Sequence, residues 1–301
     1  MTDLLVPTDR GLYCPAGDFY IDPWRPVPRA VVTHAHGDHL TRGSDAILVS
    51  DAGKHVTVAR LGSDRGVTTA AWGERRAIRG VTVSLHPAGH VLGAAQVRVE
   101  HAGEVWVVSG DYKLAPDPTT APFEPVRCHT FITESTFGLP IYRWDAPDTI
   151  AAAVRAWVTG NRTDGAATIL YGYGLGKAQR LMAMLAPLEI PIWTHGAVAA
   201  LADAYAASGV MLPASAPVSA APRDTPWHEG VIIAPPSAAG SAWLRRFGPR
   251  RREAVASGWM QVRGARRRQA VDRAFVVSDH ADWPGLLAAI EATGASRVLV
   301  T

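Results

Sequence analysis

The sequence predicts an α/β protein with two domains, and three observations support this. Short runs rich in β-branched residues, separated by turn residues, fill the first part of the chain. From about residue 145 the pattern changes to Ala- and Leu-rich stretches with helical spacing that alternate with short strands, which is typical of a doubly wound α/β unit. The length of 301 residues also suits two domains of ordinary size.

The expected elements follow in order along the chain. Strands in the first part are expected at residues 30–33, 46–49, 81–85, 96–99 and 104–108. In the second part, Asp148 can cap a helix, and the helices and strands alternate. Helices are expected at 150–158, 177–188 and 197–207, strands at 168–171, 190–193 and 274–278, and a Pro-rich loop at 212–226.

The composition is that of an ordinary globular protein, with 48% hydrophobic and 19% charged residues. The N-terminus lacks the apolar core of a signal peptide, and no apolar run is long enough to cross a bilayer, so we expect a cytoplasmic location without membrane association. Cys14 and Cys128 are too few and too isolated for a disulfide framework or a thiolate metal site. We therefore expect both to be reduced thiols without a functional role.

An HxHxDH cluster at residues 34–39 directly follows the first apolar run. Because side chains alternate along a strand, His34 and His36 can turn their imidazoles to one side and share a metal ion. Asp38 and His39 come a step later, where the chain would be turning, and could hold a second ion. Imidazole and carboxylate ligands together suit Zn²⁺, or a similar ion such as Mn²⁺, better than Ca²⁺ or Mg²⁺. The alternative interpretation is a group of scattered surface histidines.

Three further residues at the ends of expected strands could complete this site. His90 and Asp111 each follow a strand and a glycine, and the Asp111 carboxylate could bridge two metals. Taken singly, each could instead be a loop residue with local hydrogen bonds. Asp22 ends an apolar run shortly before the cluster and could hydrogen-bond a ligand imidazole, although a turn aspartate before Pro23 is a comparable interpretation.

The basic residues are uneven and consist mainly of arginine, on a chain with a formal net charge of +3. Guanidinium groups match phosphate oxygens, so the two arginine clusters fit a polyanionic substrate, and a solvated basic surface is the alternative. The clusters are Arg245, Arg246, Arg250, Arg251 and Arg252, and Arg263, Arg266, Arg267 and Arg268.

The order of Asp22, the HxHxDH cluster, His90 and Asp111 resembles the metallo-β-lactamase superfamily. Residues 132–138 resemble the acidic motif of its β-CASP nuclease branch, and residues 278–282 resemble the later histidine motif of that branch. The resemblance implies an αββα sandwich with an inserted α/β β-CASP domain. The domains are then expected at 1–144 and 257–301 for the sandwich and 145–256 for the insertion, with a C-terminal part beyond Thr301 missing.

The resemblance also implies roles for the site residues. Three imidazoles would hold one of two divalent ions, Asp38 and His39 the other, and Asp111 would bridge them. Activated water would attack the phosphate, with Asp38 counted among the catalytic residues. His280 would protonate the leaving oxygen, oriented by Glu134. The three imidazoles of the first metal are those of His34, His36 and His90.

The resemblance extends over nearly the whole chain to ligase-associated DNA exonucleases, also labelled messenger-RNA 3′-end processing factors. It implies a metal-dependent DNA exonuclease of end processing or repair, with DNA favoured over RNA and a functional association with a DNA ligase and a repair helicase. The alternatives are an RNA-cleaving β-CASP ribonuclease and a non-catalytic β-CASP scaffold subunit. A small-molecule hydrolase would leave the insertion and the arginine clusters unexplained.

Three residues are candidates for substrate contact. Lys177 follows Gly174-Leu175-Gly176, but a P-loop is excluded because Ala178 replaces the required Ser or Thr and Tyr171 the required Gly. A helix start that faces substrate phosphates remains a reasonable use of Lys177. Ser237, at another expected helix start, and nearby Arg245 are similar candidates.

Overall fold

The computed structural model describes residues 3–268 and 270–301, which form two compact units. The first unit comprises the chain up to Ile141 together with His280–Thr301, and the second comprises Tyr142–Asp279. The sequence predicts a return to the first domain at residue 257. The second unit continues further because strand β17 (Arg273–Phe275) pairs in parallel with β16 (Arg251–Ala256) and completes its sheet.

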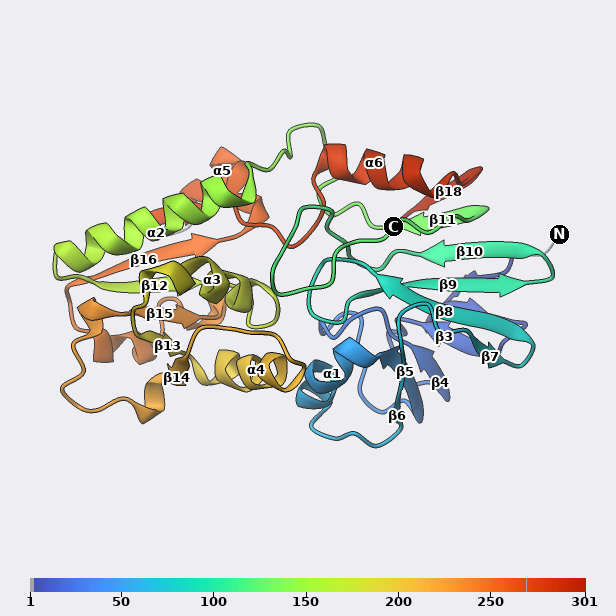
Figure 1. Ribbon diagram of the computed structural model, residues 1–301, viewed down its shortest axis with the longest axis horizontal. Coiled ribbons are helices and arrows are strands. Elements are labelled where there is room, and N and C mark those ends of the chain that lie inside the picture. Colours follow the sequence, from blue (N-terminus) through green and yellow to red (C-terminus); the bar gives the residue numbers. More distant parts are fainter. Residues whose placement is uncertain (1–2, 269) are drawn as a thin grey trace. The chain divides into compact units, whose positions relative to one another are not determined.

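The first unit contains two six-stranded sheets that pack face to face (Figure 1). Apolar side chains from both sheets share one core, which includes Ile21 and Val31 from one sheet and Leu85 and Val97 from the other. One sheet is β1 (Val6–Thr8), β2 (Gly11–Cys14), β3 (Phe19–Ile21), β4 (Arg29–Val31), β5 (Ala46–Ser50) and β6 (Val67–Ala70). The other, in spatial order, is β18 (Arg297–Val300), β11 (Thr130–Thr133), β10 (Glu104–Val108), β9 (Ala95–His101), β8 (Val81–Pro87) and β7 (Arg76–Ile78).

Helices cover the outer faces of this sandwich. Helix α1 (Lys54–Leu61) contacts β5 and β6 of the first sheet. Helix α6 (Trp283–Thr293) buries Leu286 and Ala289 against Phe131 of β11 in the second sheet. The layers are therefore helix, sheet, sheet and helix, which is the αββα sandwich expected from the sequence.

Strand direction brings several strand ends to one edge of each sheet. Strands β3 and β4 are parallel, so the segments that follow them leave the first sheet together. In the second sheet, β8 and β10 are both antiparallel to β9 and thus run in the same direction, and β11 is parallel to β10. The residues directly after these strands include those that the sequence analysis selected for a metal site.

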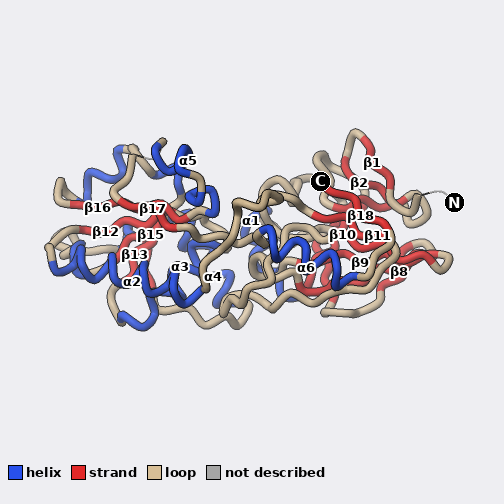
Figure 2. Tube along the Cα trace, turned by 90° about the horizontal axis from the view of Figure 1, so that it is seen from above, coloured by secondary structure: helices blue, strands red, loops and turns tan. Residues whose placement is uncertain are grey.

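The second unit has one six-stranded sheet in which every pairing is parallel. Figure 2 shows its strands (red) with flanking helices (blue). Helices α2, α3 and α4 cover one face, where Val154, Leu181 and Val198 share a core with Leu170, and short 3-10 helices cover the other face. The strands in spatial order are β14 (Ser215–Pro217), β13 (Ile192–Thr194), β15 (Val231–Ala234), β12 (Ala167–Tyr171), β16 and β17, and the helices are α2 (Pro147–Thr163), α3 (Lys177–Leu185), α4 (Gly196–Ala207) and α5 (Arg263–Arg267).

Helix boundaries differ slightly from those expected. Helix α2 starts at Pro147, so Asp148 lies in its first turn and Ala146 occupies the cap position. Pro is favoured at the first helical position because an N–H at that position would have no partner within the helix. None of the described helices is both long and apolar enough to span a bilayer.

Candidate metal centre

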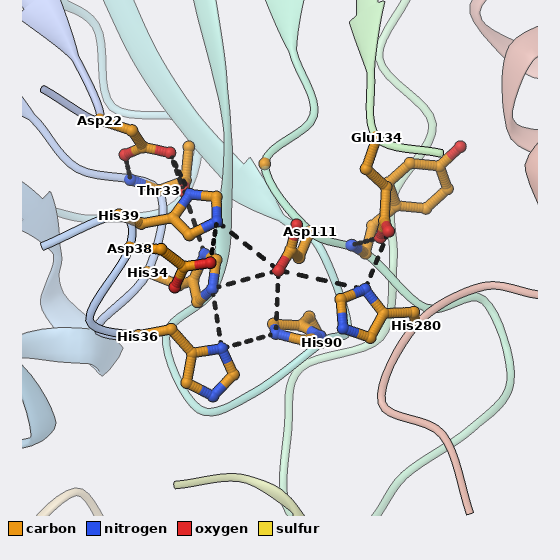
Figure 3. A network of polar contacts seen from close by, with 12 residues as sticks. Asp22, Thr33, His34, His36, Asp38, His39, His90, Asp111, Glu134 and His280 are labelled. Atoms are coloured by element: carbon orange, nitrogen blue, oxygen red, sulfur yellow. Dashed lines mark hydrogen bonds and ion pairs between the residues drawn. The ribbon is translucent and has the colours of Figure 1, made fainter. Parts of the chain in front are cut away.

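Four potential ligands converge at the strand ends of the first unit (Figure 3). The ring nitrogens His34 Nε2 and His36 Nδ1 lie 3.0 Å apart, and His90 Nε2 lies 3.1 Å from the same His36 atom. Asp111 Oδ2 lies 3.5 Å from His34 Nε2 and 3.6 Å from His90 Nε2. These side chains come from the segments after β4, β8 and β10.

The donor set and its spacing fit a tetrahedral divalent cation. Ligand atoms that hold zinc at about 2.0–2.1 Å lie roughly 3.3 Å from one another. The four donor atoms all lie within 4.8 Å of one another, at nearest distances that bracket this value. Three imidazole nitrogens that face one point cannot all hydrogen-bond one another, because in a neutral ring each nitrogen is either a donor or an acceptor and not both. The residues thus fit a metal ion, and the chemistry suits Zn²⁺ or Mn²⁺.

A second group of polar atoms lies around His39, on the other side of Asp111. His39 Nε2 lies 3.7 Å from Asp111 Oδ2 and 3.8 Å from Asp38 Oδ2. The same Asp111 oxygen therefore lies between the two groups (Figure 3). The Asp38 side chain is 81% exposed, so it lies at the rim of the centre.

Asp22 contacts the ring nitrogen of His39 that faces away from Asp111. Its Oδ2 atom lies 2.7 Å from His39 Nδ1, so the His39 Nε2 atom points toward Asp111 (Figure 3). Asp22 has a left-handed backbone, with φ at 44°, and its carboxylate accepts hydrogen bonds from the backbone N–H and the hydroxyl of Thr33. A carboxylate behind a ligand imidazole fixes its tautomer and raises its basicity.

The electrostatics favour a cation in this place. Burial, and then the neighbouring imidazoles, lower the pKa of His34 well below its ordinary value, so this ring stays neutral as a metal ligand must. Burial would also lower the pKa of His39, but Asp22 and two further carboxylates outweigh it and raise the pKa to about 9. Burial and the charge of Glu134 raise the pKa of Asp111 to about 6. The crowding of negative charge is relieved when a divalent cation binds.

A hydrogen-bonded pair, His280 and Glu134, lies beside the four-donor group. His280 Nδ1 lies 2.8 Å from Glu134 Oε2 and 4.0 Å from Asp111 Oδ2. The other carboxylate oxygen of Glu134 accepts a hydrogen bond from the backbone N–H of Tyr112 at 2.7 Å. Glu134 is thus fixed at both oxygens, and it orients the imidazole with Nε2 as the ring atom that can carry a transferable proton.

A cavity of about 400 Å³ adjoins the centre within the first unit. Asp38, His39, Asp111 and Glu134 contribute to its wall, and most of the remaining wall is apolar. This volume is in the range of pockets that hold small ligands.

The substrate contacts expected in the second unit have different outcomes. Lys177 is only 4% exposed, and its Nζ atom forms an ion pair of 2.9 Å with the equally buried Asp279. The expectation that Lys177 faces substrate phosphates is therefore wrong, because a buried partner already neutralises its charge. Ser237 and Arg245 are exposed and belong to the second unit. Cys14 and Cys128 are free and buried.

Thr33, Gly110 and Tyr112 support the centre, although none of them was among the predicted site residues. Thr33 links Asp22 to the cluster through its hydroxyl, which also lies 3.1 Å from His34 Nδ1. A Cβ on Gly110 would meet the Thr33 side chain at 2.7 Å, so glycine is required there at a φ of 55°. Tyr112 acts through its backbone N–H, which no side-chain motif reveals. The signal for Thr33 was its place directly before His34 in the sequence.

Asp22→Asn is expected to lower the affinity for metal, or the activity, by about 10- to 100-fold, the range for loss of a partner behind a metal ligand. The reason is that an amide has only one accepting oxygen and must turn its NH₂ group toward either Thr33 or His39. Titration of the metal-free protein with Zn²⁺ against a competing chelator measures the effect. Asp18→Asn is the matched control, because Asp18 also has a left-handed backbone but pairs with Arg79. Equal affinities of the two variants would contradict the role of Asp22.

The comparisons with known proteins concern both the sequence and the fold. No family model matches the sequence. Over 98% of its length the chain is 33% identical to a probable DNA ligase of Opitutus terrae, of which it covers 28%. It is 32% identical to the endoribonuclease ysh1 of Emericella nidulans over 40% of the chain and 14% of that protein. It is 30% identical to cleavage and polyadenylation specificity factor 73 of Drosophila melanogaster over 44% of the chain and 21% of that protein.

A solved structure is similar in fold. It is a protein of unknown function from Enterococcus faecalis V583, with a TM-score of 0.61 and 10% sequence identity, over 90% of this chain and 74% of that one. The chain spans less than a third of the length of each of the three relatives named above. Within that span, the relatives point to the same family as the αββα sandwich with its separate α/β unit. These relatives and this fold support the resemblance of the chain to the β-CASP nuclease branch of the metallo-β-lactamase superfamily.

Proposed function

We propose that this protein is a metal-dependent nuclease that hydrolyses phosphodiester bonds in DNA, as an exonuclease of DNA end processing or repair. The observation that carries the proposal is the place of Asp111 Oδ2, between the imidazoles on one side and the pair of His280 and Glu134 on the other. This arrangement combines a cation site with a proton donor within a few ångströms, which is what phosphodiester hydrolysis requires.

Each group has a task in this reaction. Divalent cations held at the centre, Zn²⁺ first and Mn²⁺ as the alternative, would activate water and neutralise charge on the phosphate. Asp111 and the imidazoles would hold the cations, and Asp22 would orient His39. His280 donates the proton from Nε2 to the leaving oxygen, and Glu134 keeps the ring in the orientation for that transfer. Asp38 lies beside His39 at the rim of the centre and would hold the second cation with it.

DNA is the favoured substrate because the relative that matches 98% of this chain is named a probable DNA ligase, and because the matched part is 28% of that protein. A nuclease unit within the same polypeptide as a ligase would act on the DNA ends that the ligase joins. The proposal therefore includes a functional association with a DNA ligase and, less directly, a repair helicase. An RNA-cleaving enzyme is the second candidate, since relatives named endoribonucleases match over a shorter part of the chain.

The test is digestion of labelled DNA and RNA strands of identical sequence in Zn²⁺ and in Mn²⁺. We expect linear DNA to shorten progressively from an end, while closed circular single-stranded DNA and RNA stay intact. Cleavage of RNA alone would overturn the DNA assignment, and cleavage of the circle would overturn the exonuclease assignment. Failure to cleave any strand with both metals would favour a non-catalytic scaffold subunit.

A further inference from the structure

None of the residues that form the candidate metal centre lines a pocket of about 300 Å³ in the second unit. Its wall includes Tyr173, Pro236 and Ser257, each of which follows the carboxyl end of a strand: β12, β15 and β16. These three strands are neighbours in the parallel sheet. Ligands of open parallel α/β sheets bind outside the carboxyl ends of strands, where the chain changes direction across the sheet.

The strand order places this change of direction at the pocket. From β12 the chain moves past β15 to reach β13, whereas from β15 it returns across β12 to reach β16. The pocket therefore occupies the position at which this kind of sheet ordinarily binds a ligand, and the ligand must be inferred from the side chains that line it.

Two aromatic rings at this pocket are exposed and yet held in place. Tyr173 is 56% exposed, and the Lys177 ammonium group lies 5.2 Å from its ring centroid. Lys177 is itself fixed by its buried ion pair with Asp279. Trp259 is 45% exposed and packs edge-on against Tyr142, with ring centroids 5.9 Å apart. Rings that are exposed but immobilised lose little entropy when a planar group stacks on them.

Positive charge adjoins these rings. Arg268 lines the pocket, directly after helix α5, which carries Arg263, Arg266 and Arg267. The Arg266 Nε atom donates a hydrogen bond of 2.9 Å to the backbone carbonyl of Met260, which also lines the pocket, so α5 is tied to the pocket wall. Aromatic platforms beside arginine form the usual binding surface for single-stranded nucleic acid.

We infer that this pocket binds one unpaired nucleotide of a nucleic acid strand, with its base stacked on Tyr173 or Trp259 and its phosphate near Arg268. The inference rests on the proposed function for the class of ligand, a nucleic acid. The pocket volume suits a single nucleotide rather than a duplex, and the arginines complement a phosphate. An acidic peptide would pair with the same arginines, but it has no base that could stack on the two rings.

The test is the binding of fluorescein-labelled oligothymidylate, followed by anisotropy in EDTA so that no strand is cleaved. The comparison strand has the same length and charge but abasic sites in place of the bases. We expect the wild-type protein to bind oligothymidylate about 5- to 150-fold more tightly for each base that stacks. Tyr173→Leu and Trp259→Leu should each reduce this base-dependent difference, whereas Tyr173→Phe should keep it.

The arginine gives a separate signal. Arg268→Gln should weaken the binding of both strands equally. It should also reduce the slope of log affinity against log salt concentration by about 0.7 in magnitude, the value for one phosphate contact. Arg223→Gln, at an exposed arginine that does not line the pocket, is the matched control and should change neither. Thermal unfolding of each variant identifies those that fail to fold.

The outcomes separate this inference from the proposed function. Equal binding of the two strands by the wild-type protein would overturn the pocket assignment, as would equal losses in Tyr173→Leu and Tyr173→Phe. Base-dependent binding that both leucine variants leave unchanged would also overturn it. The proposed function is judged by cleavage with metal present, so a protein that binds with base dependence but cleaves nothing contradicts only the proposed function.

Discussion

His90→Ala is expected to lower bound metal and to reduce DNA cleavage by more than about 100-fold, the upper range for loss of a residue that only supports a ligand. His90 contributes one of four converging donors, with Nε2 at 3.1 Å from His36 and 3.6 Å from Asp111. Its loss leaves three donors and an uncompensated carboxylate. Metal analysis after gel filtration, together with the initial rate of DNA digestion, measures both effects.

Chelation provides the companion experiment. Metal-free wild-type protein should be inactive and should recover when Zn²⁺ or Mn²⁺ is restored, whereas metal-free His90→Ala should not recover. His86→Ala is the matched control, because His86 lies on β8, the strand that precedes His90, but contacts Ser84, at 3.0 Å. A His90→Ala protein that keeps both metal and activity would show that the four donors are not the metal centre. Thermal unfolding of His90→Ala shows whether the cavity left by the buried imidazole destabilises the fold.

Much of the fold follows from local pattern. The β-branched runs at 81–85, 96–99 and 104–108 correspond to β8, β9 and β10, because β-branched residues between turn residues favour strands. The boundary of the second unit could not be read in this way. An arginine-rich segment and a short helix separate β16 from β17, and the pairing of these strands is a long-range contact.

The site shows the same division between local and long-range information. The residues of the centre were predictable because each follows a strand, and parallel strands end at one edge of a sheet. Lys177 was misinterpreted because a lysine at a helix start suggests phosphate binding, whereas its partner Asp279 is distant in the sequence. Buried ion pairs between distant residues leave no periodic signal. Thr33 and the N–H of Tyr112 were missed because a hydroxyl or a backbone group has no motif.

His280→Ala is expected to reduce DNA cleavage by about 10²- to 10⁴-fold, the usual contribution of a general acid. Glu134→Gln should cause a smaller loss, because the amide still contacts His280 Nδ1 but orients the ring less firmly. The effects should be far from additive, because the two residues act as a unit through one hydrogen bond of 2.8 Å. Initial rates of the two single variants and the double variant on end-labelled DNA measure this coupling.

The substrate provides the control that distinguishes proton donation from structural damage. A nitrophenyl phosphodiester has a leaving group that departs without a proton, so His280→Ala should lose far less activity on it than on DNA. His90→Ala should lose activity on both substrates, because it affects the cation site that both need. Equal losses of His280→Ala on the two substrates would contradict the assignment of His280 as the proton donor and would favour a role in metal binding, which its place beside Asp111 also permits.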